Sequence, residues 1–377
     1  MTGPVVLVNL LWLVPGRVGG SEDSVVTMLG ALADELGAPG TPEVRLALTD
    51  AVAAAHPGLL ERFPVETVRL DARSKVRRVL AEQTVLAGVA RRCRAEVVHH
   101  AGGIVPLVHP GRPVLTVHDL QPLDLPQNFS PAKRGYVRAM VGRSARAAAV
   151  VCVPSRFTAG RVVELLGVPP ERVVEVPWSV PPVAAGARTA GPPEVPGRPY
   201  FLWPAITYPH KNHVRLLEAF RRVVDRGADV DLVLTGGEGP SESEVRATVD
   251  RLGLADRVRR TGRLPRAELD DLYVAAAAVV VPSRYEGFGL PVLEAQLRGC
   301  PVVVAAAGSL PEVADAADLV DPDDVAGWAA AMLAVLDLPA DERRARADRG
   351  RQLVGRWTPR RTALAQLDAY RRAAGTA

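Results

Sequence analysis

One short segment of the 377-residue chain carries the residues best suited to bind and transform a ligand. Residues 282–295 read PSRYEGFGLPVLEA and directly follow the apolar run 275–281. Pro291 suits the first position of a helix, where its missing N–H costs nothing, and glycines before it let the backbone approach a ligand closely. Because the amides of a helix N-terminus attract anions, we expect phosphate binding here. The predicted phosphate contacts are Gly287, Phe288, Gly289 and Leu290.

Two carboxylates, Glu286 and Glu294, belong to this expected anion site and have seven residues between them. A pair of acids would repel a diphosphate unless each acid faced hydroxyl groups instead. That asymmetry favours a nucleotide sugar as the ligand, with one glutamate on the sugar hydroxyls and the other on the ribose diol. The structural alternative is a capped helix whose first-turn acids complement the helix dipole.

Apolar runs of strand length recur along the chain and indicate the elements that position this segment. Continuous apolar strands are covered on both faces, which together with intervening helices is typical of parallel α/β sheets. We expect strands at residues 5–11, 44–48, 97–99, 114–117, 150–153, 173–176, 200–203, 231–234, 279–281 and 301–305, and helices at residues 24–36, 133–148, 214–226, 242–252 and 290–298. The predicted fold class is α/β with doubly wound sheets, which bind ligands beyond the carboxyl ends of their strands.

A stretch rich in proline and glycine divides the chain into two halves of similar size, each with its own α/β series. Residues 181–199 have no helical or strand periodicity and cannot form a helix or a central strand. We therefore expect an interdomain linker there, and a cleft between two domains.

The E-x7-E motif in the form EGFGLPVLEA resembles that of the retaining glycosyltransferases of family 4. Further motifs extend the resemblance through most of the chain, and the stretch 122–130 is nearest to a subgroup with bacterial mannosyltransferases. These motifs are GGSE at 19–22, HDL at 118–120, PHKN at 209–212, GCPVV at 299–303, GSLPEV at 308–313 and DP at 321–322. The resemblance implies the GT-B fold of two facing Rossmann-like domains.

The resemblance also implies the domain boundaries and their tasks. We expect an N-terminal acceptor-side domain at residues 1–185, the linker at 186–198 and a C-terminal nucleotide-sugar-binding domain at 199–355. The last residues, 356–377, are expected to form a helix that crosses back to the N-terminal domain.

Each matched residue acquires a role from this resemblance. Lys211, one of only three lysines, is implied to contact the donor diphosphate, where its ammonium group stabilises the leaving nucleotide as negative charge builds. Gly20 would let its loop approach the donor phosphate, and His118 would hydrogen-bond a hydroxyl of the donor sugar. Glu286 would bind the sugar and Glu294 the ribose. Three structural alternatives stay open: a surface lysine, an ordinary strand-to-helix turn and a structural histidine.

The chain departs from the family pattern at two places. The arginine that commonly precedes the motif lysine is missing from PAITYPHK at 204–211, so Arg284, Arg263 or the helix amides are candidates to meet the leaving-group charge. Where the family often has P-N-G-V, this chain reads PWSV at 177–180, which alters that hinge loop.

Retention of configuration bears on what the carboxylates do. A retaining glycosidase needs two carboxyl groups about 5 Å apart on either side of the bond, whereas the family resemblance implies front-face displacement, with the leaving diphosphate helping to deprotonate the acceptor.

Asp229-Val230-Asp231 is formally a D-x-D triplet that could hold a divalent ion. It opens a predicted strand, where acids are common, so we expect no metal and no cofactor besides the donor substrate.

Composition narrows the partners and the compartment. The net charge of +4 is too small for a dedicated nucleic-acid binder. Three scattered cysteines favour a reducing compartment, and the apolar opening 5–14 is shorter than a membrane span, so we expect a cytoplasmic protein.

Residues 125–163 contain bases but no acid, and a second basic cluster lies at 73–94. This pattern fits either a solvated arginine face or peripheral contact with an anionic membrane at its inner face; apolar residues are not clearly segregated on these helices.

These observations predict a retaining, metal-independent hexosyltransferase acting in glycan, glycolipid or natural-product glycoside synthesis. It would move a hexose, with mannose favoured by the subgroup, from a nucleotide diphosphate sugar to a hydroxyl acceptor. Lys211, Glu286 and His118 are the predicted catalytic residues. Two alternatives remain, a nucleotide-sugar epimerase of the same fold and a non-catalytic nucleotide-sugar-binding protein.

Overall fold

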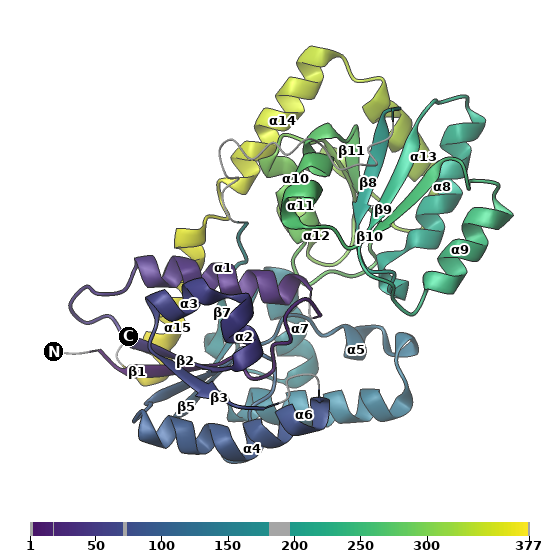
Figure 1. The fold of residues 1–377 in the computed structure, drawn as a ribbon. Coiled ribbons are helices and arrows are strands. Elements are labelled where there is room, and N and C mark those ends of the chain that lie inside the picture. Colours follow the sequence, from purple (N-terminus) through teal and green to yellow (C-terminus); the bar gives the residue numbers. More distant parts are fainter. Residues whose placement is uncertain (1–2, 18, 71–73, 181–196, 376–377) are drawn as a thin grey trace. The chain divides into compact units, whose positions relative to one another are not determined.

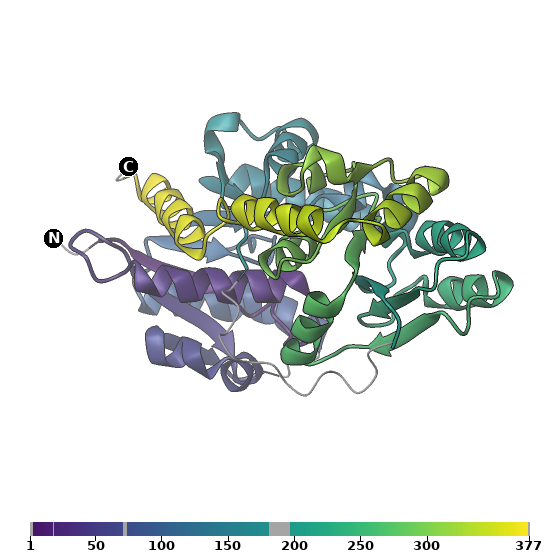
Figure 2. The same ribbon diagram turned by 90° about the horizontal axis from the view of Figure 1, so that it is seen from above.

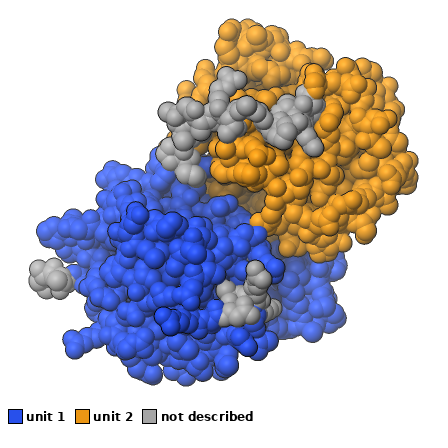
Figure 3. Space-filling view, in the orientation of Figure 1, with its two compact units in different colours: residues 1–181, 357–377 blue, residues 182–356 orange. Residues whose placement is uncertain are grey.

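The computed structural model describes residues 3–17, 19–70, 74–180 and 197–375 (Figure 1). The chain forms two compact units, coloured separately in Figure 3. Unit 1 comprises Met1–Pro181 together with Trp357–Ala377, and unit 2 comprises Pro182–Arg356. Most of the predicted linker at 186–198 lies outside the described residues, which resume at 197.

Unit 1 is built on a parallel sheet of seven strands in the order β3-β2-β1-β4-β5-β6-β7. Its strands are β1 (Val5–Asn9), β2 (Glu43–Thr49), β3 (Val65–Val68), β4 (Val97–His100), β5 (Arg112–Thr116), β6 (Val150–Val153) and β7 (Val173–Glu175). Its helices are α1 (Gly20–Asp34), α2 (Asp50–Ala55), α3 (Pro57–Arg62), α4 (Lys75–Arg92), α5 (Gln121–Asp124), α6 (Pro131–Ala147), α7 (Arg156–Leu166) and α15 (Pro359–Ala374). The strand order reverses between β1 and β4, the place where such sheets present ligand-binding side chains.

Unit 2 is built on a parallel sheet of six strands in the order β10-β9-β8-β11-β12-β13. Its strands are β8 (Tyr200–Pro204), β9 (Asp231–Thr235), β10 (Val258–Gly262), β11 (Ala278–Val281), β12 (Val302–Ala305) and β13 (Leu319–Val320). Its helices are α8 (His213–Asp225), α9 (Glu242–Arg251), α10 (Arg266–Ala275), α11 (Leu290–Leu297), α12 (Leu310–Val313), α13 (Val325–Leu336) and α14 (Ala340–Val354). Here the order reverses between β8 and β11, and these two strands lead into the segments with the strongest motifs.

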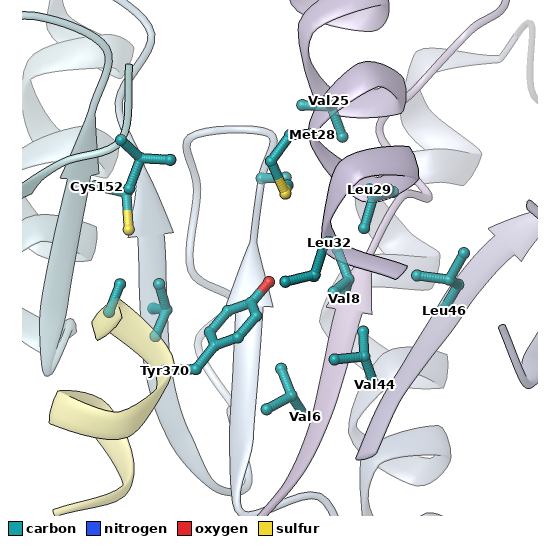
Figure 4. Packing of buried hydrophobic residues seen from close by; sticks show 14 of the residues in the cluster. Val6, Val8, Val25, Met28, Leu29, Leu32, Val44, Leu46, Cys152 and Tyr370 are labelled. Atoms are coloured by element: carbon teal, nitrogen blue, oxygen red, sulfur yellow. The ribbon is translucent and has the colours of Figure 1, made fainter. Parts of the chain in front are cut away.

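The core of unit 1 joins the two ends of the chain. Helices α1 and α15 lie side by side in Figures 1 and 2 and pack on one face of the sheet. Figure 4 shows Tyr370 of α15 among Val6, Val8 and Leu32, and all four side chains are fully buried. The last helix is therefore a structural part of unit 1.

The opposite face of the same sheet carries α4, α6 and α7. Alternate residues of a strand point to opposite faces, so Leu7, between Val6 and Val8, packs with Val89 of α4 in a separate cluster. Leu115 of β5 likewise packs with Ala145 of α6. No helix in the described part of the chain combines the length and the apolar composition that a bilayer crossing requires.

The two predicted parallel α/β series are confirmed, and every predicted strand and helix overlaps an observed one. Three strands were not predicted, namely β3, β10 and β13, and each lies at an edge of its sheet. An edge strand is short and partly exposed, so it lacks the continuous apolar run that marks a central parallel strand. The sequence of β10, VRRTG, is an example.

Candidate active site

Lys211 lies in unit 2 on the loop that follows β8 and closes a short 3-10 turn, Pro209–Lys211. The next residue, Asn212, adopts a left-handed conformation with φ 59°. Its side-chain amide donates to the carbonyl oxygens of Pro282, at 3.1 Å, and Pro322, at 2.9 Å. Because these two residues follow β11 and β13, Asn212 fixes three strand-end loops of the sheet to one another and holds Lys211 at its carboxyl edge.

Lys211 and Glu286 form an ion pair, with 2.6 Å between Nζ and Oε1. The two side chains are only 18% and 12% exposed, respectively. Burial pushes the pKa of Glu286 upward, but Lys211, His210 and Ser283 together outweigh burial, so the pKa lies below its usual value. The neighbouring His210 has its pKa lowered to about 4, by burial and then by Lys211, and is neutral at pH 7. The pair therefore carries one positive and one negative charge at neutral pH.

The backbone around Glu286 is held by the loop after β12. The Ser309 hydroxyl has one proton to donate and lies within hydrogen-bond distance of two carbonyl oxygens, that of Glu286 at 2.9 Å and that of Phe288 at 2.8 Å. Gly308 has φ +59°, and a Cβ there would lie 2.8 Å from the Glu286 carbonyl oxygen, so this position requires glycine. The loop that carries the Glu286 carboxylate is thus held in place by the loop after β12.

Helix α11 begins at Leu290, the last of the predicted phosphate contacts. Gly289 precedes it with φ 118°, and Phe288 is buried beneath the loop. No side chain caps this end of the helix, but Pro291 lacks an N–H and the Val292 amide donates to Gly289. Anion binding at this helix start would therefore depend on the backbone up to Leu290 rather than on the whole first turn.

Glu294 lies one turn into α11, and both of its oxygens already have partners. Oε1 accepts from Arg266 at 2.5 Å, and Oε2 accepts from the Tyr273 hydroxyl at 2.6 Å. Burial and then Glu294 raise the pKa of Tyr273 well above its ordinary value, so its hydroxyl stays protonated and donates. Arg266 and Tyr273 were not predicted from the sequence; their spacing of two helical turns in LPRAELDDLY was the available signal.

Two arginines, Arg284 and Arg263, are proposed to replace the missing family arginine. The side-chain contacts described for them are with residues other than Lys211. Arg284 donates to Asp323 with two nitrogens, so it would have to exchange this partner to meet a diphosphate. Arg263 lies beside Gly237, because a Cβ atom added to this glycine would lie 3.4 Å from Nε of Arg263. The backbone of Arg284 does join the site, because its amide donates to the His210 carbonyl oxygen at 2.8 Å.

The acids of the D-x-D triplet pair with arginines. Asp229 contacts Arg198 and Arg257 at 2.8 and 2.7 Å, and buried Asp231 lies 3.5 Å from Arg198. Within the described ranges, no group of three or more His, Cys, Asp or Glu residues is arranged to hold a metal ion.

His118 lies in unit 1, just beyond the end of β5, between two tryptophan rings. Its ring centroid is 5.9 Å from that of Trp12 and 5.5 Å from that of Trp178. Burial lowers the pKa of His118 to about 4, so the ring is neutral at pH 7. Nε2 lies 2.8 Å from the Ala101 carbonyl oxygen, which only accepts, so Nε2 carries the proton.

Nδ1 of His118 therefore offers a lone pair. It is buried and has no hydrogen-bond partner in the described part of the chain. His118 and Trp178 line a cavity of about 20 Å³ with Thr116 and Gln366, a size that fits one water molecule. The side chain can thus accept a hydrogen bond from a hydroxyl group. Trp12 was not predicted to be near this site, and Trp178 was noted only as a departure from the family pattern.

Gly20 is the first residue of α1, and the loop before it is fixed by Glu22 of the same motif. The Glu22 carboxylate accepts from the Gly16 amide at 2.8 Å and contacts His56 at 2.9 Å. Glu22 is nearly buried, so its charge serves to shape the glycine-rich loop.

Comparison with known proteins identifies the family. The model described as "Glycosyl transferases group 1" matches residues 191–353, and that described as "Glycosyltransferase Family 4" matches residues 18–182. A D-inositol 3-phosphate glycosyltransferase from Xylanimonas cellulosilytica is 34% identical over 295 residues, which cover 71% of this chain and 67% of the relative. O-antigen chain mannosyltransferase B from Escherichia coli is 31% identical over 228 residues, covering 57% of this chain and 58% of the relative.

Solved structures confirm the fold class. Sucrose-phosphate synthase from Thermosynechococcus elongatus superposes with a TM-score of 0.78 at 22% identity, covering 98% of each chain. Anabaena HepE in complex with UDP and glucose superposes with a TM-score of 0.69 at 18% identity, covering 94% of this chain and 95% of HepE. The predicted GT-B fold, with two Rossmann-like domains, is confirmed, and the chain belongs to the group 1 glycosyltransferases with a family 4 N-terminal region.

Proposed function

We propose that the protein transfers a hexose from a nucleotide diphosphate donor to a hydroxyl acceptor, with unit 2 holding the donor. The observation that carries this proposal is the partly buried Lys211–Glu286 pair at the carboxyl edge of a sheet, in a chain of this family. The binding of UDP and glucose by Anabaena HepE supports a nucleotide-sugar donor. The relatedness to O-antigen chain mannosyltransferase B favours mannose as the hexose.

Lys211 supplies the positive charge for the leaving group. An ammonium group has three N–H donors, and one of them is directed to Glu286. The others remain for diphosphate oxygens, on which negative charge builds as the glycosidic bond breaks. Preorganised donors of this kind lower the barrier because they need no reorientation during the reaction. With Lys211 in place, we propose that transfer needs no metal ion.

Glu286 accepts hydrogen bonds from the sugar. Its lowered pKa keeps it ionised and makes it a weak base and a poor nucleophile. We therefore propose retention by front-face displacement, in which a diphosphate oxygen takes the proton of the acceptor hydroxyl and that hydroxyl oxygen bonds to the anomeric carbon. Positioning and electrostatics then supply most of the acceleration.

We propose roles for three further residues. Glu294 binds the ribose diol, oriented by Arg266 and Tyr273. His118 accepts a hydrogen bond from a sugar hydroxyl at Nδ1, because Nε2 is committed to Ala101. Gly20 brings the backbone of its loop to the donor phosphate.

A two-stage experiment tests this proposal. Thermal unfolding with UDP, GDP, ADP and their sugars identifies the base, since a ligand at 100 times its Kd stabilises by about 2.7 kcal/mol. The selected donor is then incubated with a hydroxyl acceptor, with and without EDTA, and the product is analysed by NMR. We expect a glycoside with the anomeric configuration of the donor and no effect of EDTA. Donor isomerisation without acceptor would support the epimerase instead, binding without turnover would support the non-catalytic alternative, and an inverted product would refute retention.

A further inference from the structure

The N-terminal half of α4 exposes an apolar stripe. Val76, Val79 and Leu80 have the i, i+3, i+4 spacing that places side chains on one helix face, and their exposed fractions are 77%, 37% and 60%. In the second half of the helix, Leu86 and Val89 are buried, whereas Val85 is 42% exposed. The expectation that apolar residues are not segregated on the basic helices is therefore wrong for α4.

The apolar stripe continues onto the loop between β4 and β5. Gln83, one turn after Leu80, accepts from the Leu107 amide at 2.8 Å, and Leu107 and Val108 are exposed. The same loop is anchored to α6, because the Val105 amide donates to the Ser144 hydroxyl at 2.9 Å. The loop at 105–108 is thus hydrogen-bonded both to α4 and to the last turn of α6, all within unit 1.

The exposed charges described on α4 and on the first half of α6 are all positive, and one of them, Arg92, lies 3.8 Å from Glu66 of β3. The exposed ionisable side chains described on α4 are Arg77, Arg91 and Arg92, and those on the first half of α6 are Lys133, Arg134 and Arg138. The single acid of α4, Glu82, is partly buried and accepts from Asn9 at 2.8 Å. Residues 125–163 contain no acid. A second copy of this surface would be repelled by like charge, whereas a sheet of anionic headgroups over hydrocarbon complements both its bases and its apolar side chains.

We propose that this surface, formed by α4, the loop at 105–108 and the first half of α6, docks unit 1 onto an anionic phospholipid membrane. The apolar stripe enters the boundary between the lipid headgroups and the hydrocarbon, while arginine and lysine side chains contact the anionic headgroups. No bond is made or broken in this step, and the contact does not require sugar transfer.

Helix α4 is also hydrogen-bonded to residues around His118. Arg78 donates to the Trp12 carbonyl oxygen at 2.5 Å, and Glu82 holds Asn9 at the end of β1. The Trp12 ring in turn contacts the His118 ring in a tilted arrangement, with 5.9 Å between the ring centroids. Docking would therefore place His118 close to the membrane surface, where a lipid-linked hydroxyl acceptor is presented. This use of the contact, unlike the contact itself, rests on the proposed function.

Vesicle cosedimentation of the full chain tests the docking surface. The vesicles contain phosphatidylglycerol and phosphatidylcholine, or phosphatidylcholine alone. We expect binding to the anionic vesicles that weakens at high salt, and at least tenfold weaker binding by Leu80→Asp and by Val76→Asp. Val274→Asp is the matched control, since Val274 is 64% exposed on α10 of unit 2, and it should bind as the wild type does. Melting temperatures of all variants identify any that fail to fold.

Each other result overturns the proposal. The absence of binding to anionic vesicles, equal binding to both vesicle types, or equal losses in Leu80→Asp and Val274→Asp would show that this surface does not dock on anionic lipid. Light scattering that reports a wild-type dimer and a Leu80→Asp monomer would assign the surface to a second copy of the chain. Because vesicle binding is measured without donor, its failure is distinguishable from failure of the sugar-transfer assay.

Discussion

The two units differ in the charge state of their candidate functional residues. In unit 2, Lys211 and Glu286 are ionised and already paired at 2.6 Å. In unit 1, His118 is neutral and lies between the rings of Trp12 and Trp178. The charged pair thus lies in the unit proposed to hold the donor. The other unit holds an uncharged hydrogen-bond acceptor, which is proposed to contact a hydroxyl group of the sugar. Substitutions that affect one unit and spare the other test this division.

The largest effect is expected from Lys211→Ala, which removes the charge proposed to stabilise the leaving group. We expect kcat/KM for sugar transfer to fall by about 10³-fold, with the circular dichroism spectrum unchanged. Arg251→Ala is the control, because Arg251 is an exposed base in the last turn of α9 in unit 2. Near-normal turnover by Lys211→Ala would remove the ammonium group from the mechanism.

A smaller loss is expected from His118→Ala in unit 1. Loss of one hydrogen bond to the reacting sugar should lower kcat by up to about 10²-fold, while the Kd for the nucleoside diphosphate, measured calorimetrically, stays unchanged. Because the pKa of His118 is about 4, its titration should leave kcat constant between pH 6 and 8. His109→Ala serves as the control. A parallel loss of nucleotide affinity would contradict the division between the units.

Buried neutral histidines should make the fold sensitive to acid. Within the described residues, unit 1 holds His99, His100 and His118 with pKa values lowered to about 3, 3 and 4, and unit 2 holds His210 and His213, lowered to about 4 and 3, in each case chiefly by burial. Below pH 6.5 the unfolded chain binds these protons and the folded chain does not, so acidification lowers the free energy of unfolding.

His100→Leu tests this linkage, because neither ring nitrogen of His100 has a hydrogen-bond partner in the described part of the chain. Urea unfolding at pH 7.5 and 5.0 should show the acid-induced loss of stability reduced by about 2 kcal/mol relative to wild type, since each pKa unit corresponds to about 1.4 kcal/mol. An unchanged pH dependence would mean that His100 already binds its proton in the folded protein.

The smallest effect is expected from Glu294→Gln in unit 2. The amide keeps the shape of the side chain but loses the charge that Arg266 balances, so the Kd for the nucleoside diphosphate should rise about tenfold, as for loss of one charge-assisted hydrogen bond. Glu244→Gln, an exposed acid on α9, is the control. Equal affinities for all three proteins in a titration would show that Glu294 does not bind the ribose.

The prediction of the central strands from the sequence is confirmed, and it has a local cause. A central parallel strand is apolar along its whole length, and the motif segments at 209–212 and 286–294 lie where such strands end. The edge strands β3, β10 and β13 were not predicted because partial exposure removes that apolar signal.

The partners of the motif residues could not be predicted in the same way. Trp12 and Trp178 reach His118 from loops far from it in the sequence, and Tyr273 reaches Glu294 from a helix that was not predicted. These contacts depend on how helices pack across the sheet, which no local pattern specifies. The exposed stripe of α4 is a similar case, because the same apolar residues would suit a buried face.

The return of the last helix to the first sheet has a consequence for biosynthesis. Tyr370 hydrogen-bonds His99 at 2.9 Å across 271 positions of sequence, and α15 forms part of the hydrophobic core beside β1 and α1. During translation, the residues from Pro182 to Arg356 leave the ribosome as one continuous stretch and can fold as they emerge. The residues made before Pro182 must wait for α15, and the part of the apolar sheet face that α15 covers, beside β5 and β6, stays uncovered until then.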